Sequence, residues 1–107
     1  SLLALASASL QPLAQLPGVP LISAVFPGYT GSSWYGLVGP GKLPSLIAQK
    51  INRDVNTVLA MPDVQEKMDT YGAEDGGGSP DKFAQFIRSE QVKWAKVIKE
   101  AGVKGES

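Results

Sequence analysis

The side chains that this sequence offers for chemistry are few in kind. Its 107 residues include no Cys and no His, which removes the usual nucleophile pairings, the commonest metal ligands and the commonest general base. Catalysis would have to rest on carboxylates, lysines or hydroxyls alone, and no GxSxG-like elbow presents a serine nucleophile. We therefore do not expect an enzyme, and the sequence implies no metal and no cofactor.

Charge and glycine patterns restrict the partners further. Ten basic residues balance ten acidic ones, so there is no excess charge to attract nucleic acid or an anionic membrane surface. The glycine triplet at 76–78 could cradle a phosphate, but the Lys-Ser/Thr pair of a phosphate-binding loop does not follow it. Pro and Gly interrupt the uncharged region 1–41 too often for a transmembrane helix.

One carboxylate lies on an otherwise apolar helix face. Glu90 falls between Ile87 and Trp94 in the last predicted helix, where a carboxylate must find hydrogen-bond donors. It could contact a ligand, or it could be a structural group bonded to backbone N–H groups or a nearby cation. We favour the structural interpretation, because buried polar groups are nearly always satisfied locally.

Helical periodicity fills the second half of the chain. From Pro44, apolar residues recur at spacings of three and four: Ile47, Ile51, Val55, Val58 and Leu59. Pro62 is suited to the first position of a second, short helix, which Gly72 should stop.

The last helix is the best specified element. Ser79 can cap its free N–H groups, Pro80 fits its first position, and Gly102 should end it. Its apolar residues form one stripe: Phe83, Phe86, Ile87, Trp94, Val97, Ile98 and Ala101.

The first half predicts strands and turns. The opening SLLALASASL resembles an export signal with a cleavage site at residues 6–8, but no basic residue precedes its apolar run and the first one is Lys42. We therefore expect Leu2 to Ala6 to be a strand buried on both faces. Ser33 to Val38 should be a second strand closed by a Gly-Pro turn, and Leu21 to Phe26 a short helix or strand.

A series of short motifs carries a resemblance to one family. In the first half they are Leu16-Pro17-Gly18-Val19-Pro20, Phe26-Pro27-Gly28-Tyr29 and Ser33-Trp34-Tyr35-Gly36-Leu37 with Pro40. In the second half they are Ile51-Asn52, Val55-Asn56, Leu59-Ala60, Pro62-Asp63-Val64, Gly72-Ala73-Glu74, Phe83-Ala84-Gln85-Phe86-Ile87, Glu90, Lys93-Trp94, Val97-Ile98 and Ala101-Gly102. Together they resemble the C-terminal part of the periplasmic substrate-binding receptors of tripartite tricarboxylate transporters, the Bug family.

The resemblance implies a fold and a place for each part of the chain. Members of that family have an α/β venus-flytrap fold of two lobes, and this chain would be its C-terminal portion, with a helix-rich second half and few strands. Residues 1–31 would be the tail of the second lobe, including a core strand. Residues 32–107 would supply the crossing strand and the C-terminal helices of the first lobe.

The resemblance also implies a function and a site. The longer protein would capture a small organic carboxylate in the periplasm and present it to the membrane subunits of a transporter. Candidate ligand contacts lie at the lobe junction, where hydroxyls stand beside an aromatic wall: Tyr29, Thr30, Ser32, Ser33 and Trp34. Alternatively, the two aromatic residues at 34–35 only pack the hinge while the serines satisfy turn backbone.

A second function class remains open. The chain could be a self-contained helical module for protein–protein interaction, with the apolar stripe of the last helix gripping a partner. If it is instead a fragment of a receptor, its helices lack neighbours, and we expect it to associate with itself.

Overall fold

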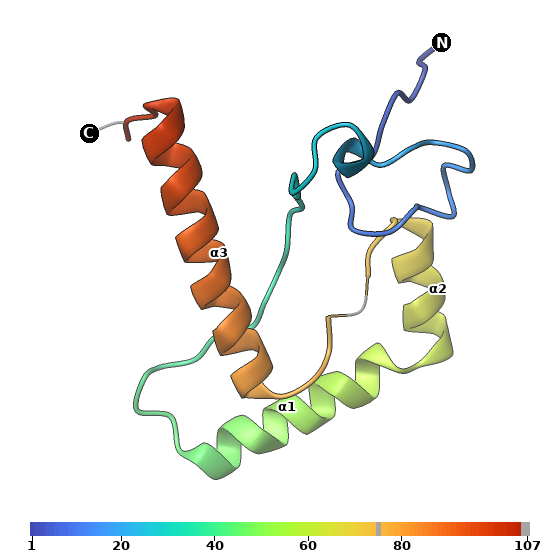
Figure 1. Cartoon of the computed structure of the whole chain (residues 1–107). Helices are drawn as coiled ribbons and strands as arrows, with labels where there is room; N and C mark the ends of the chain where they lie inside the picture. The colour runs from blue at the N-terminus through green and yellow to red at the C-terminus, as the bar shows by residue number, and fades with distance from the viewer. Residues whose placement is uncertain (75, 106–107) are drawn as a thin grey trace. The chain divides into compact units, whose positions relative to one another are not determined.

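The computed structural model describes residues 1–74 and 76–105, and these residues are organised by helices (Figure 1). A short 3-10 turn, η1, spans Ile22–Ala24, and three α-helices follow: α1 at Ser45–Leu59, α2 at Pro62–Thr70 and α3 at Pro80–Ala101. The three helices lie where the periodicity predicted them.

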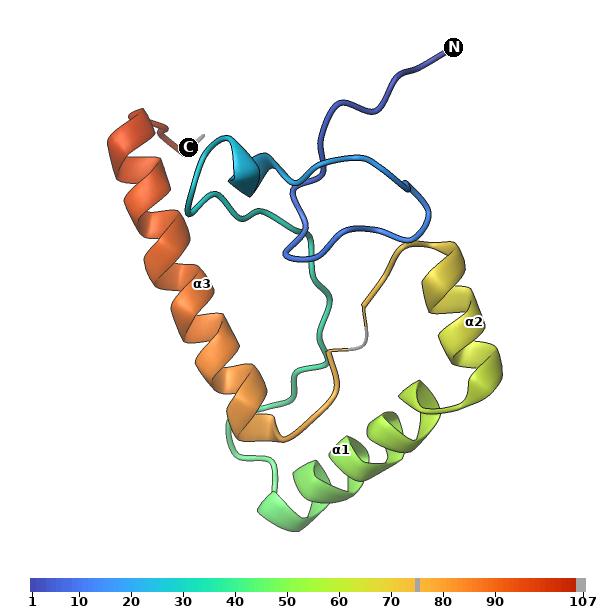
Figure 2. The ribbon, with the colours of Figure 1, turned by 45° about the vertical axis from the view of Figure 1, so that its right-hand side comes forward.

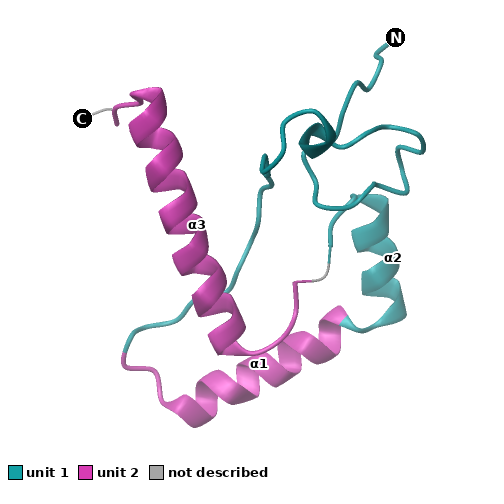
Figure 3. Ribbon diagram, viewed as in Figure 1, with its two compact units in different colours: residues 1–41, 60–75 teal, residues 42–59, 76–107 magenta. Residues whose placement is uncertain are grey.

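The chain divides into two compact units (Figure 3). Unit 1 comprises residues 1–41 and 60–75, and it contains η1 and α2. Unit 2 comprises residues 42–59 and 76–107, in which α1 packs against α3. These two units are not the two lobes expected from the sequence. The expected lobe boundary between residues 31 and 32 stays a prediction.

The strands predicted for the first half are not formed among the described residues, so the strand part of the α/β prediction is wrong there, while the helix-rich second half is confirmed. Leu2 to Ala6 and Ser33 to Val38 have no regular structure, and Leu2 is fully exposed instead of buried. A strand exists only where a neighbouring backbone accepts and donates its ladder of hydrogen bonds. Among the described residues, the one such pairing is an isolated parallel bridge between Ser7 and Leu21.

That bridge organises the first thirty residues of unit 1. The Ser7 N–H donates to the Pro20 carbonyl at 2.9 Å, and the Ile22 N–H donates to the Ser7 carbonyl at 2.8 Å. Ser7 is the only buried residue in the described part of the chain. Further along, the Gln15 side-chain amide donates to the Asp69 carbonyl in the last turn of α2, so the 12–15 loop lies beside the end of that helix (Figure 2).

The predicted helix starts are confirmed. The Ser79 hydroxyl accepts a hydrogen bond from the Lys82 backbone N–H at 3.1 Å, which satisfies one of the free donors in the first turn of α3. Pro80 and Pro62 occupy the first positions of α3 and α2, where a missing N–H costs nothing.

The predicted helix ends are also confirmed, and both have the same geometry. Gly72 and Gly102 adopt left-handed φ values of 66° and 67°. After α2, the Ala73 N–H donates to the Met68 carbonyl at 2.8 Å, and the residue after Gly102 bonds the Ile98 carbonyl in the same way. This is the Schellman arrangement, which favours glycine because a side chain strains the left-handed conformation.

The apolar faces of the helices are only partly covered within the described chain. No hydrophobic side chain is buried there. On the inner stripe of α3, Phe83 and Ile87 are half-buried, while the exposed fraction of the other large side chains runs from 37% for Phe86 to 48% for Ile98. No described helix is long and apolar enough to span a membrane. The caps and the glycines at the helix ends therefore determine where the helices lie. The free energy gained by burying hydrophobic side chains, which normally stabilises a domain, is small in the described chain.

We expect the 107-residue chain on its own to be helical without a cooperative core. Circular dichroism should show helix that melts over a broad range of urea, and a dye specific for apolar surface should bind strongly in buffer, because the stripes are open to solvent. A sharp unfolding transition without dye binding would contradict this prediction.

Candidate functional site

The predicted ligand contacts lie together on one irregular segment of unit 1. Pro27 and Gly28 turn the chain just before it, with a φ of 83° at Gly28 and a hydrogen bond of 3.1 Å from the Tyr29 N–H to the Phe26 carbonyl. Proline followed by a glycine of positive φ is the type II turn. The turn directs the chain into the site segment, which contains Tyr29, Thr30, Ser32, Ser33 and Trp34.

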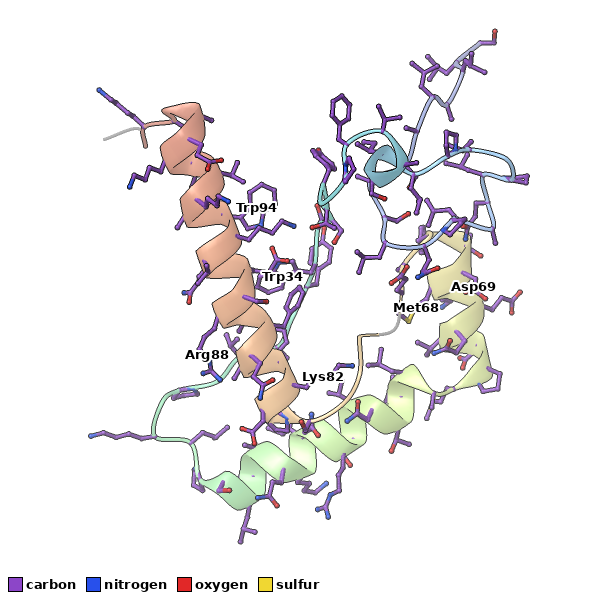
Figure 4. The ribbon with its side chains drawn as sticks, viewed as in Figure 1. Trp34, Met68, Asp69, Lys82, Arg88 and Trp94 are labelled. Atoms are coloured by element: carbon purple, nitrogen blue, oxygen red, sulfur yellow. The ribbon has the colours of Figure 1, made fainter. Side chains whose placement is uncertain are left out.

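The site segment presents hydroxyls and aromatic rings at the surface. Trp34 is 42% exposed (Figure 4), Thr30 is half-buried, and both serines are exposed. The Gly31 N–H donates to the Ala8 carbonyl at 3.4 Å, which ties the middle of the segment to the start of the chain. The segment thus offers polar groups without enclosing a ligand.

Unit 1 has a small depression at another place. Its volume is about 150 Å³, and it is lined by Pro12, Leu13, Ala14, Gln15, Asp69, Gly72, Ala73 and Glu74. Pockets that hold small molecules usually measure about 300 to 1,000 Å³. The depression includes no residue of the site segment, so we assign it no ligand. Nor do the described residues gather three acidic side chains that could hold a metal ion.

Glu90 has a structural partner, although it is not the one expected. Its Oε2 accepts a hydrogen bond of 2.6 Å from the Trp94 indole N–H, one turn further along α3 (Figure 4). The Lys93 ammonium lies 4.9 Å from the centroid of the same indole, within range of a cation–π interaction. The Glu90 carboxylate therefore orients the Trp94 indole. We expected its partner to be a backbone N–H group or a cation, and the indole N–H takes that place.

Two asparagines, which the sequence analysis named only as parts of the family motifs and gave no role, fix the start of α3. The Asn56 side chain pairs with both polar groups of Gly78: its Nδ2 donates to the carbonyl at 2.8 Å, and its Oδ1 accepts from the N–H at 2.9 Å. Asn52 Nδ2 donates to the same carbonyl at 2.8 Å, and Asn56 Nδ2 also lies 3.2 Å from Asn52 Oδ1. We call this arrangement the asparagine clamp.

Gly78 suits the clamp because it has no side chain. Its φ is 127°, and a Cβ built there would stand 2.8 Å from the Lys82 side chain. The Lys82 ammonium in turn donates to the Gly77 carbonyl at 2.7 Å. The signal for the clamp was present in the sequence, since two amides one turn apart beside Ile51 and Val55 need partners at the edge of an apolar face.

The polar face of α1 shows no sign of chemistry. Lys50 Nζ lies 2.8 Å from Asp54 Oδ2, and this hydrogen bond, with the attraction between the charges, raises the pKa of the Lys50 ammonium. Both side chains are well exposed. A solvated pair one helical turn apart supports the helix slightly and leaves no group poised for catalysis.

Comparison with known proteins connects these features to a family. The family model described as tripartite tricarboxylate transporter family receptor matches residues 1–103. A UPF0065 protein from the tcbD–tcbE intergenic region of a Pseudomonas species is 35% identical over 99 residues, which are 91% of this chain and 30% of that protein. The protein BugT of Bordetella pertussis is 30% identical over 105 residues, 97% of this chain and 32% of BugT.

A third relative is shorter. The UPF0065 protein from the clcB–clcD intergenic region of Pseudomonas knackmussii is 31% identical over 97 residues, which are 89% of this chain and 57% of that protein. The chain thus spans about a third of two of these relatives and somewhat more than half of the third.

The asparagine clamp can be tested with Asn56→Asp. A carboxylate keeps the acceptor for the Gly78 N–H but loses both donated hydrogen bonds and repels the Gly78 carbonyl, so the free energy of unfolding should fall by about 1 to 3 kcal/mol. Urea denaturation of the complete protein measures this change.

Gln49→Glu is the matched control, because it makes the same chemical change on the same helix. The Gln49 amide donates only to the Ser45 hydroxyl one turn away, and both side chains are exposed. Its effect should stay within about 0.5 kcal/mol. Equal losses in the two variants would show that the clamp has no special role.

Proposed function

Because this chain belongs to the tripartite tricarboxylate transporter receptor family, we propose that it is the C-terminal part of a periplasmic receptor. The complete receptor binds a small organic carboxylate and delivers it to the membrane subunits of a tripartite transporter. The match over residues 1–103 is the observation that carries the proposal. The family is one of solute-binding transport receptors and not a class of enzymes.

The uncovered apolar faces support a longer receptor. The stripes of α1 and α3 remain open in the described chain, and such faces normally gain their stability from packing. In a two-lobed receptor, residues 32–107 would complete the first lobe and residues 1–31 would close the second. The remaining two thirds of a receptor as long as BugT would then cover these stripes.

The site segment is our candidate for ligand contact in that receptor. The hydroxyls of Ser32 and Ser33 have no hydrogen-bond partner among the described residues, and hydroxyls are good donors to a carboxylate. The partly exposed Trp34 ring can wall a cleft that opens at the junction of residues 31 and 32. Closure of the lobes would remove water and strengthen each of these contacts.

The alternative is a self-contained helical interaction module, and the exposed stripe of α3 is the observation that favours it. Phe86, Trp94 and Ile98 could grip a helical partner as an apolar anchor. The two proposals differ in what the 107-residue chain can do alone: an interaction module works without further residues, whereas a receptor fragment does not bind its solute.

The function can be tested with a panel of di- and tricarboxylates. Calorimetry should detect binding of at least one of them to the complete receptor and none to the 107-residue chain, because a flytrap ligand draws its affinity from both lobes. Light scattering at micromolar concentration should show the short chain self-associating through its open stripes. A monomeric short chain that binds a carboxylate would overturn the proposal and favour an independent domain.

The site segment can be tested with the two tryptophans of the chain. In the complete receptor, with any other tryptophan replaced by Phe, a variant that keeps only Trp34 should change its fluorescence when the ligand binds. A variant that keeps only Trp94, whose indole N–H is held by Glu90, should change little. A response confined to Trp94 would move the site away from the site segment.

A further inference from the structure

The two units carry very different charge, although the chain as a whole is neutral. The ten acidic residues divide evenly, five in each unit, but nine of the ten basic residues belong to unit 2 and only one to unit 1. Unit 2 therefore has an excess of four positive charges, and five of its basic residues lie on α3. Such an excess favours contact with a negatively charged partner.

One side of α3 combines three of these cations with an exposed hydrophobic residue. Arg88, Val92, Lys96 and Lys99 follow one another at spacings of four, four and three, so they share one side of the helix. We call this side the outer face of α3. It extends along the helix for about 16 Å, at 1.5 Å per residue.

The outer face is open to solvent and its charges are hardly neutralised. Val92 is 73% exposed, and the Lys96 side chain is 75% exposed and meets Glu100 only at 3.9 Å. Within the described residues Arg88 and Lys99 form no ion pair. The Arg88 side chain is exposed and extends away from the ribbon of α3 (Figure 4).

The outer face also stays accessible when the helix is packed in a larger protein. The stripe that contains Phe86, Trp94 and Ile98 lies on the opposite side of α3, and it is the side that packing must cover. A helix that buries this stripe leaves Arg88 and Lys99 in water. The outer face then presents Val92 among cations, and an apolar centre with a polar rim is the usual composition of a protein interface.

We propose that the outer face of α3 docks an acidic protein surface with a small apolar centre. On the proposed function, on which this inference rests, that surface belongs to the membrane subunits of the transporter. A protein fits better than a lipid surface, because a single exposed Val cannot insert into a membrane as the apolar face of an amphipathic helix does.

The test uses the complete receptor and the transporter's membrane subunits reconstituted in nanodiscs. The triple variant Arg88→Glu, Lys96→Glu and Lys99→Glu should bind the nanodiscs that contain the membrane subunits, here called loaded nanodiscs, about tenfold or more weakly than wild type at low salt. Most of this loss should lie in the association rate. At high salt the difference from wild type should shrink, since screening weakens exposed charges. Val92→Asp should weaken binding at both salt concentrations.

The matched control is the triple variant Lys42→Glu, Lys50→Glu and Arg53→Glu, which makes the same charge change in unit 2 but off α3. It should bind the transporter nearly as well as wild type. Nanodiscs of the same lipids without the membrane subunits should bind neither receptor. Equal losses in both triple variants, or equal binding to the empty nanodiscs, would overturn the proposal.

Calorimetry with the carboxylate panel on the same samples separates the two proposals. If wild type and the outer-face variant bind a carboxylate equally and also bind the transporter equally, the docking proposal is wrong and the receptor function stands. If wild type binds a carboxylate but not the loaded nanodiscs, docking is likewise wrong. If it binds no carboxylate, the receptor function itself fails.

Discussion

The constraint on which this structure depends is that an amphipathic helix becomes stable only when its apolar side is covered. α1 and α3 each carry a continuous apolar stripe, and α1 packs against α3, yet no hydrophobic side chain is buried in the described chain. The two stripes thus form only one side of a hydrophobic core, and the described residues do not supply the other side. Propensity and caps together supply only a few kcal/mol, so the described residues alone give these helices little stability.

Features fixed by neighbouring residues were predictable from the sequence. The Ser79 cap, the prolines at helix starts and the glycines at 72 and 102 all act within a few residues of themselves, so their sequence signals are complete. The strands were not predictable in the same way. Leu2 to Ala6 has the composition of a buried strand, but composition cannot supply the neighbouring strand that pairing needs.

The same distinction separates the parts of the candidate site. The hydroxyls and the Trp34 ring belong to one short segment, and the sequence alone brings them together behind the turn at Gly28. The asparagine clamp is different, because Asn52 and Asn56 are 26 and 22 positions away from Gly78 in the sequence. The sequence indicates that the two amides need partners, but only the fold shows that the partner is Gly78. Its pairing with a backbone N–H and carbonyl resembles the pairing of two peptide groups, and it satisfies both backbone polar groups of the glycine before α3.

The two sides of α3 differ in how their charged side chains are used. On the inner side of α3, Glu90 and Lys93 hold the Trp94 indole by a hydrogen bond and a cation–π contact, which orients the largest side chain of the stripe before it is packed. On the outer side, Arg88 and Lys99 lack such partners among the described residues and remain extended into water. Glu90 and Lys93 thus act within their own helix, whereas Arg88 and Lys99 remain available for the acidic partner that we propose for the outer face.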